Sequence, residues 1–549
     1  MVTVYRGNLI GTSMRGHELA LKHFLGTGNN VMWDEEPAKD LINEINWHDE
    51  SATGKLDFLV NLNIRMDSSA NYSDVVLPAA FWYEKYDVTF GDMHTFVHPL
   101  TPATQPPWEA KHDWEAFKLI AKKFSEMAKT HFPEPVKDIV LNALWMDSPD
   151  QLAQPMGEVR DWKAGETELV PGKTFPKIAI VERDYTKVYD QLVSLGPLVS
   201  QPGGYGSKGQ YADLTPIVEE ELKHNEVLDV KDGRVYFEKP EQACELILQI
   251  SPELNGRLSS LFFKEMEKKV GLPLADMVEV VKGRKVHYKD IISQPRRIHT
   301  TPQWSAMLHD KDGKQRTFGP WTMNIERLKP WHTLSGRQEI YYDHQGLREL
   351  GEALPTNKPP LDMVAIGDIN MDKAGPNSKV FRFITPHGKW QIHSSFRDHW
   401  PMVHMSRGGP TVWINPGDAD DIQVKDNDWV EMYCENGIEV VRAVVSHQVP
   451  RSMAITYHQV ERNVNVPFSP LAKKNAASDL RGGNNNATTR ILMNPHTMIG
   501  GYAQFSYYIN YWGTSPSERD HGVLIRKMPL GADGKPVYQE GDLHKVPVE

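Results

Sequence analysis

The densest set of chemically versatile side chains in this sequence lies in one short segment. Thr385, His387, Lys389, His393 and Ser394 bring together hydroxyl groups, imidazoles and an ammonium group. Such a segment, which directly follows an apolar run, suits an anionic ligand that makes many hydrogen bonds. A polar surface loop has the same composition, so the residues alone leave both interpretations open.

A metal site is another interpretation of the same region. His399 and His404 follow closely on His387 and His393, and imidazole nitrogens bind zinc and iron readily. The spacing of these histidines supports a metal site only weakly. A zinc hydrolase built on these histidines would bind zinc stoichiometrically and would contain no organic cofactor such as a pterin.

Amide side chains concentrate in a second segment, residues 482–490, behind two glycines. An amide offers both a donor and an acceptor, which a heterocycle with alternating N–H and C=O groups along its edge requires. Asn486 is therefore a candidate for contact with a purine or a pterin. An ordinary capping turn explains the segment at least as well.

Residues 203–209 resemble a phosphate-binding loop only at first sight. They read Gly-Gly-Tyr-Gly-Ser-Lys-Gly and lack the Gly-Lys-Ser/Thr order that a nucleoside triphosphate loop requires. We expect a flexible connection at this point.

The first hundred residues must position part of any such site. Short apolar runs at Phe58-Leu59-Val60 and at residues 75–78 predict buried parallel strands in an α/β arrangement. Between them, residues 61–69 form a polar loop at the carboxyl end of the first predicted strand. Open α/β sheets bind ligands at such ends.

The middle of the sequence predicts short helices. From His112 to about Met127, apolar residues recur at helical spacing and indicate a surface helix: Trp114, Phe117, Ile120, Ala121, Phe124 and Met127. Residues from about 130 to 330 mix further short helices, one of them around residues 243–250, with long connections rich in Pro and Gly.

After about residue 375 the pattern changes to successive short strands, which predict a small barrel. The predicted strands are residues 381–384, 411–414, 429–434, 438–445 and 453–457. Asn436-Gly437 suits a tight hairpin turn. Asn415-Pro416 suits a helix cap followed by proline at the first helical position, so residues 418–421 are expected to form one short helix inside the barrel domain.

The composition excludes several classes of protein. At roughly 150 residues per domain, the 549 residues suggest about three or four domains. Hydrophobic content of 40% and charged content of 24% exclude wholesale disorder. The net charge of −11, with Lys and Arg interspersed among acids, disfavours nucleic-acid binding.

The cysteine content and the apolar runs exclude further classes. Cys244 and Cys434 are the only cysteines, so this sequence supplies no four-cysteine cluster, zinc ribbon or disulfide framework. We expect two buried thiols. No apolar run has the length of a membrane span, and the first residues lack the features of an export signal.

Several longer motifs, taken in order, resemble those of one family. They are residues 65–68 (Arg-Met-Asp-Ser), 72–78 (Tyr-Ser-Asp-Val-Val-Leu-Pro), 82–85 (Trp-Tyr-Glu-Lys), 333–338 (Thr-Leu-Ser-Gly-Arg-Gln), 407–410 (Arg-Gly-Gly-Pro) and 498–504 (Met-Ile-Gly-Gly-Tyr-Ala-Gln). Together they resemble the C-terminal half of the catalytic alpha subunit of respiratory nitrate reductases, which are molybdopterin oxidoreductases. The resemblance extends over essentially the whole chain.

This resemblance implies a fold and a cofactor. The fold is α/β followed by a β-rich barrel domain, as the C-terminal half of a multidomain molybdopterin oxidoreductase. It implies an end of an α/β dinucleotide-binding domain at residues 1–110, a mixed helical intervening region at 111–330, and a β-barrel molybdopterin-dinucleotide-binding domain at 331–549. The cofactor is bis-molybdopterin guanine dinucleotide, whose molybdenum takes an oxygen atom from nitrate and releases nitrite.

The resemblance also implies roles for particular residues. Guanine and phosphate groups would be held by Arg6, Asn8, Ser13, Arg65 and Asp67. The pterins would be lined by Thr385, His387, Lys389, His393, Ser394 and Asn486, with Asn510 and Tyr511 as weaker additions. His387 and His393 are the candidate catalytic residues, because neutral imidazoles near the metal can hydrogen-bond an oxo group or nitrate. Neither is expected to act as a base.

The sequence departs from the family in two respects. It has no set of one histidine and three cysteines for the family's 4Fe-4S cluster, and no segment that matches the one carrying the aspartate ligand of molybdenum. Both belong to the N-terminal half in that family. We therefore expect a fragment, a split-gene product or a start at an internal Met, which alone does not reduce nitrate.

The expected partners follow from the same resemblance. They are the N-terminal half of the subunit, an iron–sulfur beta subunit and a haem-containing membrane gamma subunit, in a membrane-associated complex at the cytoplasmic face. Two alternatives stay open. One is nitrite oxidation, the same oxygen transfer in reverse; the other is a non-catalytic cofactor-binding or assembly module, which would bind pterin without a metal redox signal.

Overall fold

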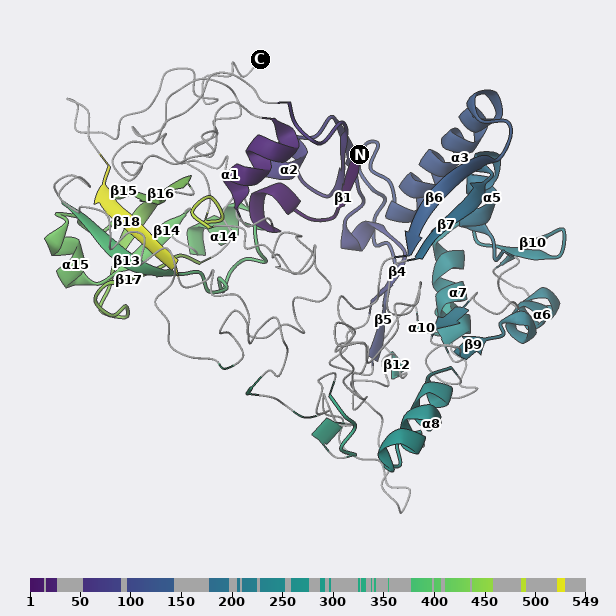
Figure 1. Ribbon diagram of the computed structural model, residues 1–549. Coiled ribbons are helices and arrows are strands. Elements are labelled where there is room, and N and C mark those ends of the chain that lie inside the picture. Colours follow the sequence, from purple (N-terminus) through teal and green to yellow (C-terminus); the bar gives the residue numbers. More distant parts are fainter. Residues whose placement is uncertain are drawn as a thin grey trace. The chain divides into compact units, whose positions relative to one another are not determined.

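The computed structural model of the chain (Figure 1) describes residues 1–13, 16–26, 53–89, 96–142, 177–196, 205–207, 210–224, 228–251, 258–275, 287–291, 296–297, 324–325, 327–331, 337, 340–341, 354, 377–396, 399–405, 410–434, 437–457, 485–489 and 521–528. The chain divides into two compact units. Unit 1 comprises Met1–Leu77 and Gln345–Glu549, and unit 2 comprises Pro78–His344. The first strands and the strand-rich region thus share one unit, while domain boundaries at residues 110 and 330 stay predictions.

Unit 1 begins with a small sheet. Strands β1 (Val2–Tyr5) and β2 (Leu59–Asn63) pair in parallel, and β3 (Val75–Pro78) completes the order β1-β2-β3. Its buried cluster includes Val4 and Leu59, which pack with Ile10 and Leu21. The predicted first strand is confirmed, but it extends to Asn63, so the polar segment expected to be a loop starts inside the strand.

The expectation that residues 75–78 are buried is wrong. Val75 and Val76 are 36% and 37% exposed. Their strand, β3, lies at an edge of the three-stranded sheet in the described part of the chain, so it has a neighbour on one side only. Apolar composition predicted the strand correctly, but not its place in the sheet.

Short helices surround this sheet. They are η1 (Leu9–Ser13), α1 (His17–Ala20), η2 (Leu21–Leu25) and α2 (Ser68–Asn71). Asp67 caps α2, because its Oδ1 accepts a hydrogen bond of 2.8 Å from the Ala70 N–H. The chain after β2 therefore turns at once into a helix.

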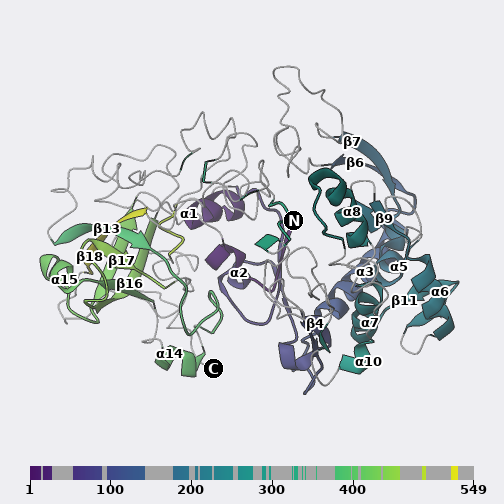
Figure 2. The ribbon, with the colours of Figure 1, turned by 90° about the horizontal axis from the view of Figure 1, so that it is seen from below.

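Unit 1 also contains a closed barrel (Figure 2). It contains β13 (Ser378–Ile384), β14 (Thr411–Ile414), β15 (Trp429–Cys434), β16 (Gly437–Val445), β17 (Met453–Ile455) and β18 (His521–Lys527). Their order around the barrel is β13-β17-β14-β16-β15-β18. The predicted strands from residue 381 to residue 455 are confirmed, whereas β18 was not predicted.

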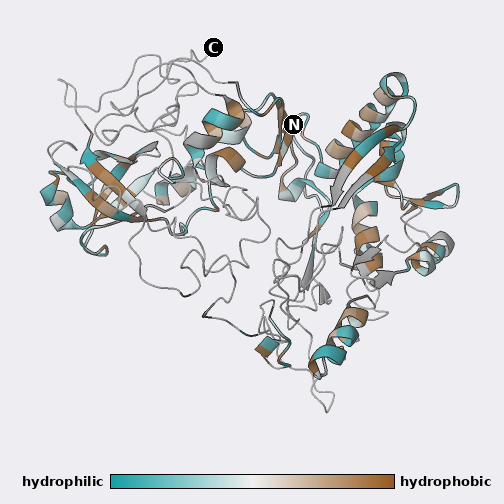
Figure 3. Cartoon of the chain, viewed as in Figure 1, coloured by the Kyte–Doolittle hydropathy of each residue, from teal (hydrophilic) through white to brown (hydrophobic). Residues whose placement is uncertain are grey.

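The barrel interior is apolar. Phe381, Phe383, Met432, Val441 and Ile525 belong to one cluster of fully buried side chains contributed by different strands. The alternation along β13, where Phe381 and Phe383 are buried and the intervening residue is exposed, is that of a strand with one face on a core. Figure 3 shows the apolar residues along β18.

One short helix, α15 (Pro416–Asp421), closes part of the barrel as the sequence predicts. The Asn415 side chain caps it by accepting a hydrogen bond of 3.0 Å from the Gly417 N–H. A second helix, α14 (Trp400–Met405), lies between β13 and β14 in sequence.

Unit 2 mixes helices with small sheets and hairpins. Its helices are η3 (Trp82–Glu84), α3 (Asp113–His131), η4 (Tyr185–Lys187), α5 (Val188–Val193), α6 (Thr215–His224), α7 (Pro240–Ser251), α8 (Ser259–Val270) and α10 (Tyr288–Ile291). Its strands are β4 (Asp87–Thr89), β5 (Phe96–Leu100), β6 (Val136–Asn142), β7 (Lys177–Arg183), β8 (Tyr205–Ser207), β9 (Gln210–Ala212), β10 (Asp229–Lys231), β11 (Arg234–Tyr236) and β12 (Arg296–Arg297). None of the helices described in either unit is both long and apolar enough to cross a membrane.

Two expectations for unit 2 need correction. Residues 205–207 form β8, paired antiparallel with β9, and not a flexible connection. The helix predicted from His112 is confirmed as α3, but Ile120, Phe124 and Met127 are largely exposed. Its buried positions are mainly small residues, such as Ala121 and Ala128, which permit close approach of a neighbouring element.

Candidate functional site

The polar segment Thr385–Ser394 leaves the barrel at the carboxyl end of β13. Because β13 and β17 run parallel, with Ile384 opposite Ile455, Thr385 and Thr456 follow at the same end of the barrel. Thr385 and Thr456 are both buried. The end of the barrel thus has a polar rim above an apolar interior.

The two candidate histidines lie next to each other in this segment. The ring centroids of His387 and His393 are 5.6 Å apart, with the rings at 69° in an edge-to-face arrangement. Both side chains are exposed, as is Lys389, whose Nζ lies 4.7 Å from the centroid of the Trp390 ring. The sequence-predicted imidazoles and ammonium group are therefore accessible to a ligand.

A tight turn presents His393. Ile392 and Ser395 exchange backbone hydrogen bonds of 3.3 and 2.8 Å, which leaves His393 and Ser394 as the two residues of the turn. His393 has a φ of +52°, in the left-handed region that favours glycine. This turn carries an imidazole where sterics alone favour a residue without a side chain.

Asn8 connects this turn to the small sheet and its helices. Its Nδ2 donates to Ser394 Oγ at 3.1 Å. Its Oδ1 accepts from the Gly11 N–H at 3.0 Å, the Ser69 N–H at 3.1 Å and the Ser69 hydroxyl at 2.8 Å. The structure thus brings the sequence-predicted residues Asn8 and Ser394 into direct contact.

Residues 485–489 form a second bridge to the N-terminal segment. Asn486 Nδ2 donates to the Thr12 carbonyl at 2.7 Å, and the Asn486 carbonyl accepts from the His17 N–H at 3.1 Å. Cys434, the last residue of β15, donates its thiol to the Thr488 carbonyl at 3.2 Å. Asn486 therefore lies at the junction between the barrel and the small sheet, close to other predicted residues.

The remaining predicted residues of the N-terminal segment lie around β2. Asp67 accepts a hydrogen bond of 2.7 Å from Asn63 Nδ2 in addition to capping α2, so its carboxylate supports the local fold. Arg6 and Arg65 are half-buried, and Arg6 has a φ of +48°. Both arginines lie just beyond strand ends, where phosphate groups are commonly bound.

Some predicted residues cannot be placed. Asn510 and Tyr511 lie outside the described residues, as does the side chain of Ser13, whose backbone belongs to η1. His399 and His404 are exposed, and no group of three or more His, Cys, Asp or Glu in the described ranges is arranged to hold a metal ion. The zinc hydrolase interpretation gains no support from these ranges.

Several buried polar atoms in unit 1 lack a hydrogen-bond partner within the described part of the chain. They are Thr456 Oγ1, Asn485 Oδ1 and both amide atoms of Asn61. Buried polar groups are rarely left unpaired in native proteins, so such atoms indicate contact with a polar group from elsewhere. Asn485 precedes Asn486 in sequence, and Thr456 follows β17 as Thr385 follows the parallel strand β13. The hydrogen-bonding capacity of Thr456 and Asn485 fits a nitrogen-rich heterocycle.

These additional residues differ in how far the sequence could have indicated them. Asn485 belongs to the run of amides already noted, so its type and position carried a signal. A lone threonine after a strand carries none, and Thr456 is identified only by its position opposite Thr385 and by its unpaired hydroxyl.

Unit 2 contains a buried polar cluster with a structural role. Glu245 on α7 accepts from His287 Nδ1, the Tyr288 N–H and Gln249 Nε2, each at 2.6 Å. The bonds from His287 and Tyr288 fasten the start of α10 to α7, and the bond from Gln249 lies within α7. Both cysteines of the sequence are free and buried, and burial raises the pKa of the Cys244 thiol to about 12, which excludes a reactive thiolate.

Three family models match successive parts of the chain. Residues 18–123 match the molybdopterin oxidoreductase model, residues 203–326 match nitrate reductase alpha chain, domain V, and residues 381–504 match the molybdopterin dinucleotide binding domain. The last match begins inside β13, at Phe381, and includes β14 to β17, the segment Thr385–Ser394 and the segment 485–489.

Individual relatives agree with these models. The nitrate reductase alpha chain of Bacillus subtilis is 42% identical over 529 residues, which cover 96% of this chain and 42% of that protein. The respiratory nitrate reductase 1 alpha chain of Escherichia coli is 39% identical over 546 residues, which cover 98% of this chain and 43% of that protein. This chain therefore spans less than half the length of the curated relatives it matches.

More distant proteins also match. The perchlorate reductase subunit alpha of Dechloromonas aromatica is 25% identical over 473 residues, covering 86% of this chain and 36% of that protein. The solved structure of acetylene hydratase from Pelobacter acetylenicus matches with a TM-score of 0.36 and 11% identity, covering 86% of this chain and 40% of that chain. Because the identities to the alpha chains extend over nearly the whole sequence and the three models follow one another along it, this chain belongs to the molybdopterin oxidoreductase family, among the nitrate reductase alpha chains.

Proposed function

We propose that this chain forms the cofactor-enclosing part of the catalytic subunit of a respiratory nitrate reductase, with an α/β segment that precedes the barrel. The observation that carries the proposal is the junction at the end of the barrel. There Ser394 and Asn486 bond to three residues of the N-terminal segment, Asn8, Thr12 and His17, through hydrogen bonds. Asn8, Ser394 and Asn486, which the family resemblance indicated, take part in these bonds and support the proposal.

The residues at this junction fit a bis-molybdopterin guanine dinucleotide. Pterin and guanine rings alternate donors and acceptors, which match the unpaired Thr456 Oγ1 and Asn485 Oδ1 and the amide of Asn486. Thr385 adds a hydroxyl at the same end of the barrel, and Asn510 and Tyr511 are proposed to contact the pterins as well. When bound, the molybdenum of this group supplies the oxygen-atom transfer chemistry.

The phosphate and guanine groups are assigned to the N-terminal segment. Arg6 and Arg65 offer guanidinium groups that pair well with phosphate oxygens, and Ser13 offers a hydroxyl. Asn8 and Asp67 act mainly through the backbone that they hold, since their side chains bond to Ser69, Gly11 and the start of α2.

His387 and His393 are assigned to the substrate. Their exposed rings lie in edge-to-face contact, so both imidazoles can reach one small anion. A ring N–H donates a hydrogen bond to an oxygen atom of nitrate, and the nearby Lys389 ammonium group raises the local concentration of anions. No proton transfer is required of either histidine.

The other components are proposed to lie on further polypeptide. The relatives are more than twice as long as this chain, and we assign the 4Fe-4S cluster and the aspartate ligand of molybdenum to the additional part. Iron–sulfur beta and haem-containing gamma subunits would deliver electrons in a membrane-associated complex, at its cytoplasmic face. Nitrite oxidation uses the same groups in reverse, and the physiological electron donor or acceptor decides the direction.

The proposal is tested on the native enzyme that carries this sequence. Mass spectrometry gives the mass of the polypeptide, elemental analysis gives molybdenum, and acid hydrolysis releases guanine nucleotides for chromatography. We expect a mass well above 62.4 kDa, about two guanine nucleotides for each molybdenum, and nitrate reduction with a reduced dye as electron donor. Guanine nucleotide without molybdenum or turnover indicates a cofactor-binding module instead.

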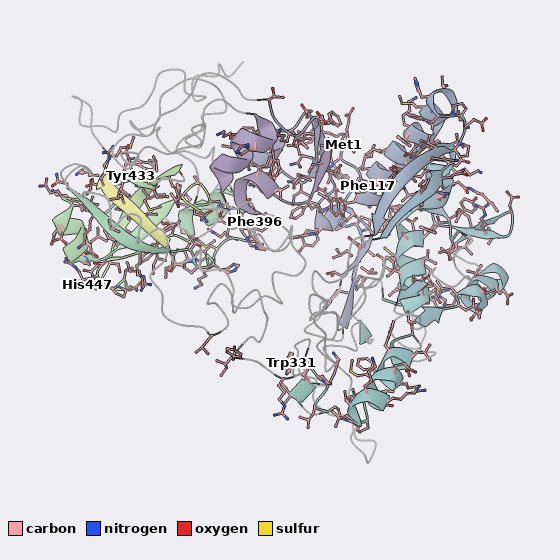
Figure 4. The ribbon with its side chains drawn as sticks, viewed as in Figure 1. Met1, Phe117, Trp331, Phe396, Tyr433 and His447 are labelled. Carbon is pink, nitrogen blue, oxygen red and sulfur yellow. The ribbon has the colours of Figure 1, made fainter. Side chains whose placement is uncertain are left out.

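Variants test the role of the histidines. His387→Gln and His393→Gln are expected to lower kcat for nitrate by roughly 100-fold, the usual loss for a donor that stabilises a transition state. His447→Gln is the matched control, because His447 is exposed in the turn after β16, away from the loop that contains Phe396 (Figure 4). Equal activity of all three variants contradicts the assignment.

A further inference from the structure

The turn that carries His393 is in contact with a residue from outside the barrel, Asn8. The backbone bridge between Ile392 and Ser395 closes the turn, but His393 adopts a positive φ that side chains rarely tolerate. Strained residues of this kind persist where surrounding contacts hold them in place. One such contact is made by Ser394, a residue 3% exposed, whose hydroxyl accepts from Asn8 Nδ2 at 3.1 Å.

The Asn8 amide is itself held in one orientation. Its Oδ1 accepts three hydrogen bonds, from the Gly11 N–H and from the N–H and hydroxyl of Ser69. A flipped amide would direct NH₂ at these three donors, so Nδ2 must face Ser394. The orientation of the amide is thus determined by residues on η1 and α2, and not by the barrel.

The space around this amide is also restricted. A Cβ atom added at Gly11 would lie 2.5 Å from both Asn8 Oδ1 and Asn8 Nδ2, closer than real Cβ atoms approach other heavy atoms. Glycine at this position therefore lets the backbone of η1 pack directly against the amide. Hydrogen bonds and packing together fix the position of Asn8 Nδ2, the donor to the Ser394 hydroxyl.

We propose that Asn8 is a positioning residue for His393: through its buried hydrogen bond to Ser394 it fixes the turn that presents the imidazole to substrate. The inference rests on the proposed role of His393 in nitrate reduction. It assigns Asn8 a role other than contact with the cofactor. The position of the His393 imidazole, on a loop of the barrel, then depends on the N-terminal segment that begins with β1.

The test compares variants of the native, cofactor-loaded enzyme. Ser394→Ala removes the acceptor, Asn8→Ala removes the donor, and Gly11→Ala displaces the amide without removing either group. All three are expected to lower kcat for nitrate by about 10- to 100-fold, since small displacements of a catalytic group have effects of this size. Molybdenum and guanine nucleotide content should stay at the wild-type level.

Hydrogen–deuterium exchange supplies a readout that does not depend on activity. The Ile392 and Ser395 amides close the turn, and we expect them to exchange roughly fivefold faster in Ser394→Ala, as for the loss of one hydrogen bond. Asn8→Asp is the conservative variant, because its second carboxylate oxygen can accept from the Ser394 hydroxyl. It should restore slow exchange and most of kcat. Ser446→Ala is the control, because this half-buried serine follows β16 at the other end of the barrel and its hydroxyl accepts only from the neighbouring Gln448 N–H, at 3.2 Å, among the hydrogen bonds of the described residues.

The outcomes separate this inference from the proposed function. Unchanged exchange in Ser394→Ala and Asn8→Ala would show that the hydrogen bond does not hold the turn and would overturn the inference. Faster exchange with wild-type kcat would overturn the positioning role. If the wild-type enzyme does not reduce nitrate, the proposed function fails. If His393→Gln retains full kcat, the role of His393 fails. In both cases the inference fails as well.

Discussion

The carboxylate of Asp418 is fully buried between two cations. Its Oδ1 lies 2.6 Å from Lys379 Nζ and 3.0 Å from Arg451 Nε, and its Oδ2 accepts from the Ser452 N–H at 2.7 Å. Lys379 belongs to β13 and Asp418 to α15, so this one side chain joins the short helix to the barrel wall. Because Asp418 is buried, loss of its charge or of a partner's charge should destabilise the protein.

Asp418→Asn should destabilise the barrel strongly. The substitution preserves volume but replaces the buried charge by an uncharged amide. Lys379 and Arg451 are partly exposed and keep their ion pairs with Asp421, at 2.7 and 2.6 Å, so we expect a loss of about 2 to 3 kcal/mol and not the full cost of a broken buried pair. Denaturant unfolding of the native protein and hydrogen exchange of the β13 amides measure it. Asp420→Asn makes the same charge change at an exposed neighbour and should cost less than about 0.5 kcal/mol. Equal losses would contradict the interpretation.

His112 should make stability depend on pH. Burial lowers the pKa of this histidine below its ordinary value of 6.5, and Nδ1 lacks a partner among the described residues. As the pH falls below about 6.5, the unfolded chain therefore takes up a proton before the folded chain does, and stability is lost. His112→Asn should reduce this loss between about pH 7 and pH 5 in denaturant titrations. Parallel curves for the two proteins would refute this explanation.

Single residues also show how far sequence reasoning reaches. Asn8 and Ser394 were both indicated as site residues, but their mutual hydrogen bond was not, because 386 positions separate them. Local composition identifies which side chains have useful chemistry. It does not identify which of them are already occupied by bonds to each other, and that decides whether Asn8 binds a ligand or holds a turn.

At the scale of elements, the cap of α15 was predicted in detail. Asn415 accepts from the Gly417 N–H at 3.0 Å, and its Nδ2 also donates to the Val449 carbonyl at 2.7 Å. Asn415→Ala removes both bonds and should cost about 2 kcal/mol. Asn415→Asp keeps the cap and loses the second bond, so about half of that cost is expected. Denaturant unfolding of both variants tests the ranking, which the reverse order would contradict.

Local sequence patterns predicted strands well where the strands follow one another closely in sequence. The strands from β13 to β17 follow one another closely and carry alternating apolar residues, whereas β18 arrives only after residues 456–520. For α3, helical spacing predicted the helix but not its buried side. Ala121 and Ala128 lie on the buried side of α3 because their small size permits close packing. The prediction used only the spacing of apolar residues and not their size.

At the scale of the whole molecule, the N-terminal segment and the barrel form one unit despite their separation in sequence. A cofactor bound at their junction should therefore stabilise both. A ligand at about 100 times its dissociation constant contributes about 2.7 kcal/mol, or roughly 100-fold slower exchange. Removal of the cofactor should speed exchange in residues 385–396 and 485–489. The α7 amides of unit 2 should not change, and a uniform increase would argue against this site.

The position of β18 in the barrel has a consequence for how the protein is made. β18 is the strand that pairs with both β13 and β15. Until residues 521–527 have been synthesised, these two strands expose unpaired backbone groups that can pair with other chains. Adding residues 456–527 at about 5 to 20 residues per second takes roughly 4 to 14 seconds. For that interval each nascent chain presents two open sheet edges, so its yield should depend on protection at the ribosome.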